Sequence, residues 1–141
     1  MTERPVPRRG DHLFKFLAVV FDVTRAEELL EHAKLVKVNP HDFDSIIDMV
    51  RIDKERVKDA DLSKPGIMVT FKVPQKGKPG EIFTVLIDGW HRARRHLDVG
   101  TPGMPVYHFG DPEFVMREFA WVRGMQSAPG RYVEEYSGSP T

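Results

Sequence analysis

The chain has 141 residues, with 21 basic and 21 acidic side chains that leave no formal net charge. This length predicts a domain large enough to bury a core without cross-links. The balanced charge argues against a general nucleic-acid binder, which needs a basic excess. Cysteine is absent, which excludes disulfides, thiolate catalysis and thiol-ligated metals.

The N-terminal segment, residues 1–11, is polar and rich in Pro and Arg, so it lacks the apolar centre of a secretory signal. The apolar run at residues 16–21 is far too short to span a membrane. We therefore expect a cytoplasmic protein without a membrane partner. We expect a single domain over residues 1–125, with residues 1–11 as a flexible arm, and a flexible tail over residues 126–141, where Gly, Ser and Pro are frequent.

The first apolar segment, residues 14–23, is rich in Phe and Val and predicts one buried strand. Thr24 and Glu27 then have the spacing of a capping box, in which a hydroxyl and a carboxylate satisfy free amides at a helix start. We expect this helix to end before Pro40, because proline disfavours a helical residue before it. Its apolar stripe consists of Leu29, Leu30, Ala33 and Val36.

Residues 42–62 have an ambiguous pattern. The segment 52–60 fits a short helix, and residues 61–66 have the composition of a turn. Helical spacing is also present upstream, at Phe43, Ile46, Ile47 and Val50.

The middle of the chain predicts a hairpin followed by a helix. Residues 67–73 alternate in polarity, as in a strand with one buried face. A turn over residues 75–80 joins them to residues 82–87, which are apolar on both faces, as in a central strand. A helix over residues 90–99 follows, closed by Gly100 as a left-handed cap.

Two more elements complete the predicted fold. Residues 105–109 predict a strand. Asp111 as N-cap and Pro112 at the first helical position predict a last helix. Its inner stripe is expected to consist of Val115, Phe119 and Val122.

The turn at Asp88 and Gly89, between a buried strand and a basic helix, carries the candidate chemistry. Glycine has no Cβ, so a ligand can approach the backbone closely. The free amides and the positive dipole end of the helix favour an anion, and arginines nearby can clamp phosphate oxygens. The candidate phosphate- or nucleotide-binding residues are Gly89, Arg92, Arg94 and Arg95.

Helical geometry places these side chains on different faces. Trp90, Ala93 and Leu97 share the face that should pack on the sheet, which makes Trp90 part of the core rather than a platform for a base. His91 and Arg92, nearest to the N-terminus of the helix, are best placed for a ligand at the turn.

Asp88 and His91 are the candidate catalytic residues. Asp88 could act as a general base or metal ligand, or it could cap the helix. His91 could hold a phosphate or move protons near neutral pH, or it could be a surface histidine. Arg92 fits a phosphate contact, or a structural ion pair with Asp61 or Glu81.

The other basic residues of the helix also have alternative interpretations. Arg94 lies near the apolar face and could reach over the edge of the sheet. Arg95 and His96 also fit a solvated face, since surface charges are common and mostly inert.

Residues 86–93, Leu-Ile-Asp-Gly-Trp-His-Arg-Ala, resemble the Asp-Gly-His-His-Arg type of signature in ParB/sulfiredoxin-like domains. In ParB proteins the corresponding motif is Gly-Glu-Arg-Arg-x-Arg-Ala, which contacts the phosphates of CTP. Gly89, Arg92 and Arg94 match its Gly, second Arg and third Arg. His91 replaces the first Arg, and Arg95 replaces the Ala.

Two other groups in this superfamily share part of the motif. Sulfiredoxins have Gly-Cys-His-Arg, but Trp90 stands at the position of the Cys, which excludes sulfiredoxin chemistry. Nucleotide-dependent free-serine kinases have Asp-Gly-His-Thr-Arg-Ala, which matches Asp88, Gly89, Arg92 and Ala93.

The resemblance covers about residues 62–110 and implies an α/β fold of the ParB/sulfiredoxin-like type, with a small mixed sheet and flanking helices. The Glu-Asn-x-Gln-Arg motif of ParB and a downstream helix-turn-helix domain are absent, so the chain is not a full-length ParB.

We predict that residues 87–95 bind a nucleotide or another phosphorylated ligand. Phosphoryl transfer or nucleotide hydrolysis would follow if Asp88, or else Asp61, supports a metal or a base. A nucleoside triphosphate or diphosphate with Mg²⁺ would be the natural cofactor. The alternatives are a nucleic-acid-binding module or nuclease that uses the basic helix 90–99, and a non-enzymatic protein-interaction domain.

Overall fold

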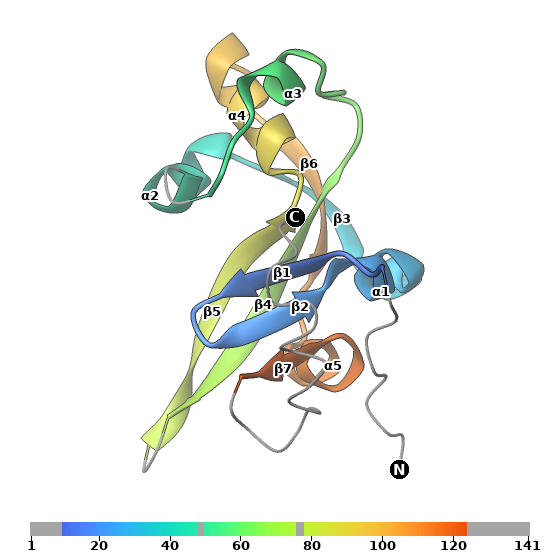
Figure 1. Cartoon of the computed structure of the whole chain (residues 1–141), viewed down its shortest axis with the longest axis vertical. Coiled ribbons are helices and arrows are strands. Elements are labelled where there is room, and N and C mark those ends of the chain that lie inside the picture. The colour runs from blue at the N-terminus through green and yellow to red at the C-terminus, as the bar shows by residue number, and fades with distance from the viewer. Residues whose placement is uncertain (1–9, 48–49, 76–77, 124–141) are drawn as a thin grey trace.

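The computed structural model describes residues 10–47, 50–75 and 78–123. Two small sheets, with strand orders β1-β2-β7 and β3-β6-β4-β5, are surrounded by short helices (Figure 1). The strands are β1 (Leu13–Phe16), β2 (Val19–Asp22), β3 (Lys34–Val38), β4 (Gly66–Gln75), β5 (Lys78–Asp88), β6 (Met104–Phe109) and β7 (Ala120–Val122). The helices are α1 (Val23–Glu28), α2 (Asp44–Ile47), α3 (Lys54–Lys58), α4 (Trp90–Val99) and α5 (Pro112–Glu118), with 3₁₀ turns η1 (Leu30–His32) and η2 (Pro40–Phe43).

The larger sheet is mixed, because β4 pairs in parallel with β6 while β3–β6 and β4–β5 are antiparallel. The α/β class and the mixed sheet are therefore confirmed. Within the described ranges, no helix has the length and apolar character needed to cross a membrane.

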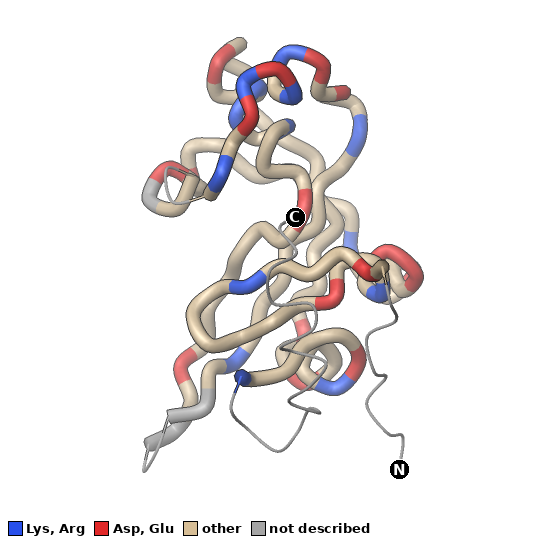
Figure 2. The backbone as a smooth tube through the Cα atoms, viewed as in Figure 1, with Lys and Arg blue, Asp and Glu red and all other residues tan. Residues whose placement is uncertain are grey.

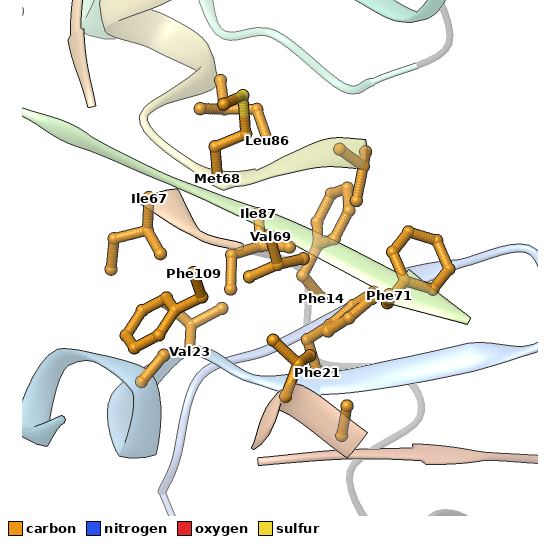
Figure 3. Close-up of a cluster of buried hydrophobic side chains, with 14 of the residues drawn as sticks. Phe14, Phe21, Val23, Ile67, Met68, Val69, Phe71, Leu86, Ile87 and Phe109 are labelled. Atoms are coloured by element: carbon orange, nitrogen blue, oxygen red, sulfur yellow. The ribbon is translucent and has the colours of Figure 1, made fainter. Parts of the chain in front are cut away.

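The main core lies between the two sheets (Figure 3). Phe21 of β2 meets Phe71 of β4 edge-on, with 5.0 Å between ring centroids. Ile67, Val69 and Phe71 lie on the side of β4 that faces the smaller sheet, and Met68 lies on the opposite side (Figure 3). The predicted alternation of this strand is confirmed, although Met68 is also buried.

The first predicted strand, residues 14–23, is instead a hairpin of β1 and β2. The two strands pair in antiparallel register, with Phe16 opposite Val19. Leu17 at the turn has a positive φ of 55° and is 60% exposed. The turn was missed because neither Leu17 nor Ala18 is a typical turn residue.

The helix that follows is shorter than predicted. Asp22, not Thr24, is its N-cap and accepts a hydrogen bond from the Arg25 amide at 3.0 Å. The Thr24 hydroxyl accepts from the amide of His12 at 2.8 Å. Residues 34–38 form strand β3, paired with β6, where the sequence predicted helix. Val36 and Val38 are β-branched residues that suit a strand, and the pairing with β6 stabilises it.

The ambiguous segment contains the short helices α2 and α3. Asp53 caps α3 by accepting from the Glu55 amide at 2.9 Å, so a helix within residues 52–60 is confirmed with narrower bounds. The turn at residues 61–66 is also confirmed: Asp61 Oδ1 accepts from the amide and the hydroxyl of Ser63, at 3.0 and 2.6 Å.

The predicted hairpin between β4 and β5 is confirmed, and its strands extend to the pair Gln75 and Lys78. The prediction that β5 is central is wrong, because it lies at the edge of the described sheet. Val85, Leu86 and Ile87 are buried, whereas Ile82 is 63% exposed. These three residues are buried although β5 pairs with a single strand, so their burial does not require a central position.

The C-terminal elements agree with the sequence up to the end of α5. Asp111 caps α5 by accepting from the Glu113 amide at 3.0 Å. Val115 and Phe119 are buried as predicted. Val122, however, belongs to β7, a strand that was not predicted.

The predicted arm and tail fall mostly outside the described residues, which exclude 1–9 and 124–141. Asp11, the last residue assigned to the arm, is only 7% exposed, so the folded part begins before residue 12.

Candidate functional site

The strand-to-helix turn is built on Gly89. Gly89 is the N-cap residue of α4, has φ 96° and ψ 23°, and provides no side-chain cap. A Cβ at this position would lie 3.0 Å from Gly66 Cα and 3.3 Å from Arg92 Nη2. Glycine therefore lets the turn approach the start of β4 and adopt a backbone conformation that L side chains rarely adopt.

Asp88 does not cap the helix. Its Oδ2 accepts a hydrogen bond from Arg92 Nη2 at 3.1 Å, one turn along α4. The N-cap interpretation of Asp88 is therefore wrong, and the amides at the start of α4 have no side-chain cap.

Arg92 makes two hydrogen bonds at the turn. Besides Asp88, its Nη1 donates to the Pro65 carbonyl at 3.0 Å, and its side chain is only 15% exposed. Arg92 thus forms an ion pair with an acid, as the structural alternative predicted, but the acid is Asp88 and neither of the examples, Asp61 and Glu81.

His91 accepts a hydrogen bond through Nε2 from the Asp53 amide at 3.1 Å. Burial lowers the pKa of His91, and the nearby charges of Arg56 and Arg92 lower it further, while Asp53 acts in the opposite direction. The ring is therefore neutral at pH 7, with its proton on Nδ1. Nε2 is occupied, so any proton transfer would have to use Nδ1.

The side chains of Arg94 and Arg95, the other two arginines of α4, bond to groups away from the turn. Arg94 Nε bonds to Asp98 Oδ1 at 3.3 Å, and Arg94 lines a neighbouring pocket. Arg95 Nη1 donates to the last carbonyls of α3, those of Val57 and Lys58. Neither residue lines the pocket at the turn.

His96 is 2% exposed, so its assignment to a solvated face is wrong. The assignment of Trp90 to the core is confirmed: it is 3% exposed and packs against Phe14 and Phe43.

A pocket of about 390 Å³ opens at the turn. Of the residues proposed from the sequence, Asp88, Gly89, His91 and Arg92 line it, and so does Asp61, the alternative carboxylate. Sequence reasoning missed Lys64 and Arg56, which come from the loop before β4 and from α3. Their only signal was that Lys64 lies within a predicted turn and Arg56 within a predicted short helix. The complete lining is His12, Arg56, Asp59, Ala60, Asp61, Lys64, Asp88, Gly89, Trp90, His91 and Arg92.

The charges of the pocket are balanced. Arg56, Lys64 and Arg92 stand against Asp59, Asp61 and Asp88. Acidic and basic residues also alternate along α3 and its flanking segments (Figure 2). The site is therefore polar and charged without being strongly basic.

Glu27 adds a carboxylate near Asp88. Its pKa is raised, first by burial and then by the charge of Asp88, while His12, Lys64 and Arg92 lower it. The pKa of Asp61 is lowered, mainly by the hydrogen bonds from Ser63. Within the described part of the chain, no three His, Asp or Glu side chains are grouped so that they could hold a metal ion.

Buried His96 predicts a loss of stability in mild acid. Its pKa is lowered by burial, while the Leu62 backbone opposes this shift; neither ring nitrogen forms a hydrogen bond of normal geometry. The ordinary histidine pKa is about 6.5. The stability that depends on a neutral ring is complete above that value and is lost as the pH falls through the folded-state pKa.

We expect the free energy of unfolding to decrease from pH 7 to pH 5, and His96→Leu to reduce this decrease. Urea denaturation at several pH values measures this change in the free energy of unfolding. His41→Leu, at an exposed histidine, is the control. An equal dependence on pH in wild type and His96→Leu would contradict the assignment.

No protein-family profile, curated protein or solved structure matches this chain.

Proposed function

We propose that the pocket at the β5–α4 junction binds a nucleotide or another phosphorylated ligand. The main support is the start of α4, a helix of 10 residues whose N-terminus has no side-chain cap. Its first residues, Gly89, Trp90 and His91, line the pocket. Uncapped amides at the positive end of a helix dipole are a favourable environment for an anion.

Two cations are suited to meet the ligand. Lys64 is exposed and lines the pocket from the loop before β4. Arg92 lines it from α4, although two of its five N–H groups are already used by Asp88 and Pro65. Arg94 and Arg95 are bonded elsewhere and are not part of the proposed contact.

The carboxylates of the pocket favour a ligand that carries Mg²⁺. A bare phosphate would be repelled by Asp59, Asp61 and Asp88, which balance the three cations. Mg²⁺ is usually held by one or two carboxylates together with substrate phosphates and waters. Asp61 and Asp88 are our proposed carboxylate ligands, and they would also support phosphoryl transfer or nucleotide hydrolysis.

The resemblance of residues 86–93 to ParB/sulfiredoxin-like domains supports the same proposal. We also propose that the chain has the ParB/sulfiredoxin-like fold. Among the matching positions, Asp88, Gly89 and Arg92 line the pocket. Arg94 also matches the ParB motif but lies outside the pocket.

We expect one nucleotide among ATP, ADP, CTP and GTP to raise the unfolding temperature, and to do so more strongly with Mg²⁺. A ligand at 100-fold over its Kd stabilises a fold by about 2.7 kcal/mol. Lys64→Ala should weaken binding about 10- to 100-fold, since a charged hydrogen bond contributes roughly 1.5–3 kcal/mol and about 1.4 kcal/mol is a factor of ten. We choose Lys64 rather than Arg92 for substitution because Lys64 is exposed. Loss of Arg92 would also remove the hydrogen bond to the Pro65 carbonyl.

Lys34→Ala, an exposed lysine on β3 outside the pocket, is the control and should bind like wild type. No shift with any nucleotide would refute the proposal. A shift that Lys64→Ala and Lys34→Ala reduce equally would place binding elsewhere.

A further inference from the structure

The pocket has two walls that come from different parts of the chain. One wall is the end of β5 and the start of α4. The other consists of residues 53–65, here called the α3 segment, which contributes Arg56, Asp59, Ala60, Asp61 and Lys64. The position of Lys64, which lines the pocket, therefore depends on where this segment lies.

The α3 segment has little apolar anchorage. Of its residues, Val57 alone is buried, and most of the others are exposed. The segment forms no strand pairing in either sheet. Burial of one valine contributes roughly 1.5–3 kcal/mol, which is little for a segment of this length, so polar contacts must contribute to its position.

Three side chains of α4 supply such contacts. His91 Nε2 accepts from the Asp53 amide at 3.1 Å, at the beginning of the segment. Arg95 Nη1 donates to the carbonyls of Val57 and Lys58 in its middle. Arg92 Nη1 donates to the Pro65 carbonyl at 3.0 Å, at its end.

Of the two carbonyls that Arg95 contacts, that of Val57 also accepts from the Ala60 amide at 3.2 Å, whereas that of Lys58, the last residue of α3, is the one that needs a partner. The last carbonyls of a helix have no partner within it, and a basic side chain nearby can satisfy them. Because all three contacts go to the backbone, they depend on the position of the α3 segment and not on its side chains.

We propose that His91, Arg92 and Arg95 are positioning residues that hold the α3 segment against α4 and so place Lys64 and Arg56 at the pocket. Their effect on a ligand rests on the proposed function, but their effect on the segment does not. His91 then contributes as a hydrogen-bond acceptor rather than as a proton carrier. Arg95 contributes to binding without contacting the ligand.

The test is hydrogen–deuterium exchange of the full, ligand-free chain, read by mass spectrometry. In His91→Leu and in Arg95→Met, amides of residues 53–65 should exchange about tenfold faster, while peptides from β4, β5 and β6 keep the wild-type rate. His91→Gln retains an acceptor and should restore most of the protection. Arg94→Ala is the matched control, because Arg94 lies on the same helix but bonds to Asp98.

Unchanged exchange of residues 53–65 in both His91→Leu and Arg95→Met would overturn the proposal. A uniform acceleration over the whole chain would also overturn it, because it would indicate general destabilisation.

Nucleotide affinity is measured on the same variants. If the wild type binds, His91→Leu and Arg95→Met should each weaken binding severalfold and Arg94→Ala should not. Faster exchange with unchanged affinity would overturn the link to the ligand. If the wild type binds no nucleotide, the proposed function fails, and the exchange data still decide whether these residues position the segment.

Discussion

Replacing Gly89 with alanine is expected to lower the free energy of unfolding by about 2–5 kcal/mol. A residue other than glycine in the left-handed region costs roughly 1–2 kcal/mol, and Gly89 has φ 96°. The added Cβ would also lie 3.0 Å from Gly66 Cα, closer than ordinary contact. Overpacking of this kind costs typically 1–3 kcal/mol.

Gly100→Ala is the matched control, because Gly100 also has a positive φ, of 76°, at the other end of α4. A Cβ there meets no atom within 4 Å, so only the backbone strain remains. We expect Gly100→Ala to cost about 1–2 kcal/mol, measured by urea denaturation in parallel with Gly89→Ala. Equal losses in the two variants would show that the close approach to Gly66 is unimportant.

Replacing Trp90 with alanine should lower the free energy of unfolding by about 3–5 kcal/mol, as expected for truncation of a large buried aromatic residue. Trp90 is 3% exposed, stacks on Phe14 at 6.2 Å between ring centroids, and meets Phe43 edge-on at 5.9 Å. Its loss would separate α4 from both β1 and η2, and would leave a cavity beside the pocket.

Trp90→Phe keeps an aromatic ring but removes the indole N–H, so it tests whether packing or hydrogen bonding accounts for the contribution of Trp90 to stability. Trp90 Nε1 has no hydrogen-bond partner among the described residues, so Trp90→Phe should cost only the lost volume, about 1–2 kcal/mol. Chemical denaturation measures both variants, and Trp90→Phe still tests the idea if Trp90→Ala does not fold. A loss in Trp90→Phe as large as 3–5 kcal/mol would contradict packing as the main contribution.

The candidate site was only partly predictable from the sequence. Gly89, His91 and Arg92 were correctly placed near one another, because they fall within four consecutive residues, 89–92, at a strand-to-helix turn. The partners of these residues were not predictable. Asp53, Pro65 and Val57 lie 27 to 38 positions away in the chain from the α4 side chains that bond to them.

For Arg94 and Arg95 too, the sequence predicted the position in the helix but not the bonding partner. The sequence places both on the basic helix and makes both candidate phosphate contacts, although only Arg94 matches an Arg of the ParB motif. Only the fold directs Arg94 to Asp98 and Arg95 to the end of α3. These side chains are long enough to reach in several directions, so the neighbouring elements decide which partner each one takes.

The sequence by itself determined the elements whose signals are local. Gly100 closes α4, Asp111 and Pro112 begin α5, and the alternation in residues 67–73 marks β4. Each depends on groups only a few positions apart, whose geometry is set by backbone dihedrals and nearby hydrogen bonds.

Tertiary structure decided the elements whose stability comes from distant partners. Residues 34–38 had a helical stripe but became β3 by pairing with β6, and residues 120–122 became β7 by pairing with β2. It also decided that β5 lies at an edge and that residues 53–65 form one wall of the pocket. Hydrogen bonds between strands and burial between layers join residues far apart in the chain, and their free energy outweighs weak local preferences.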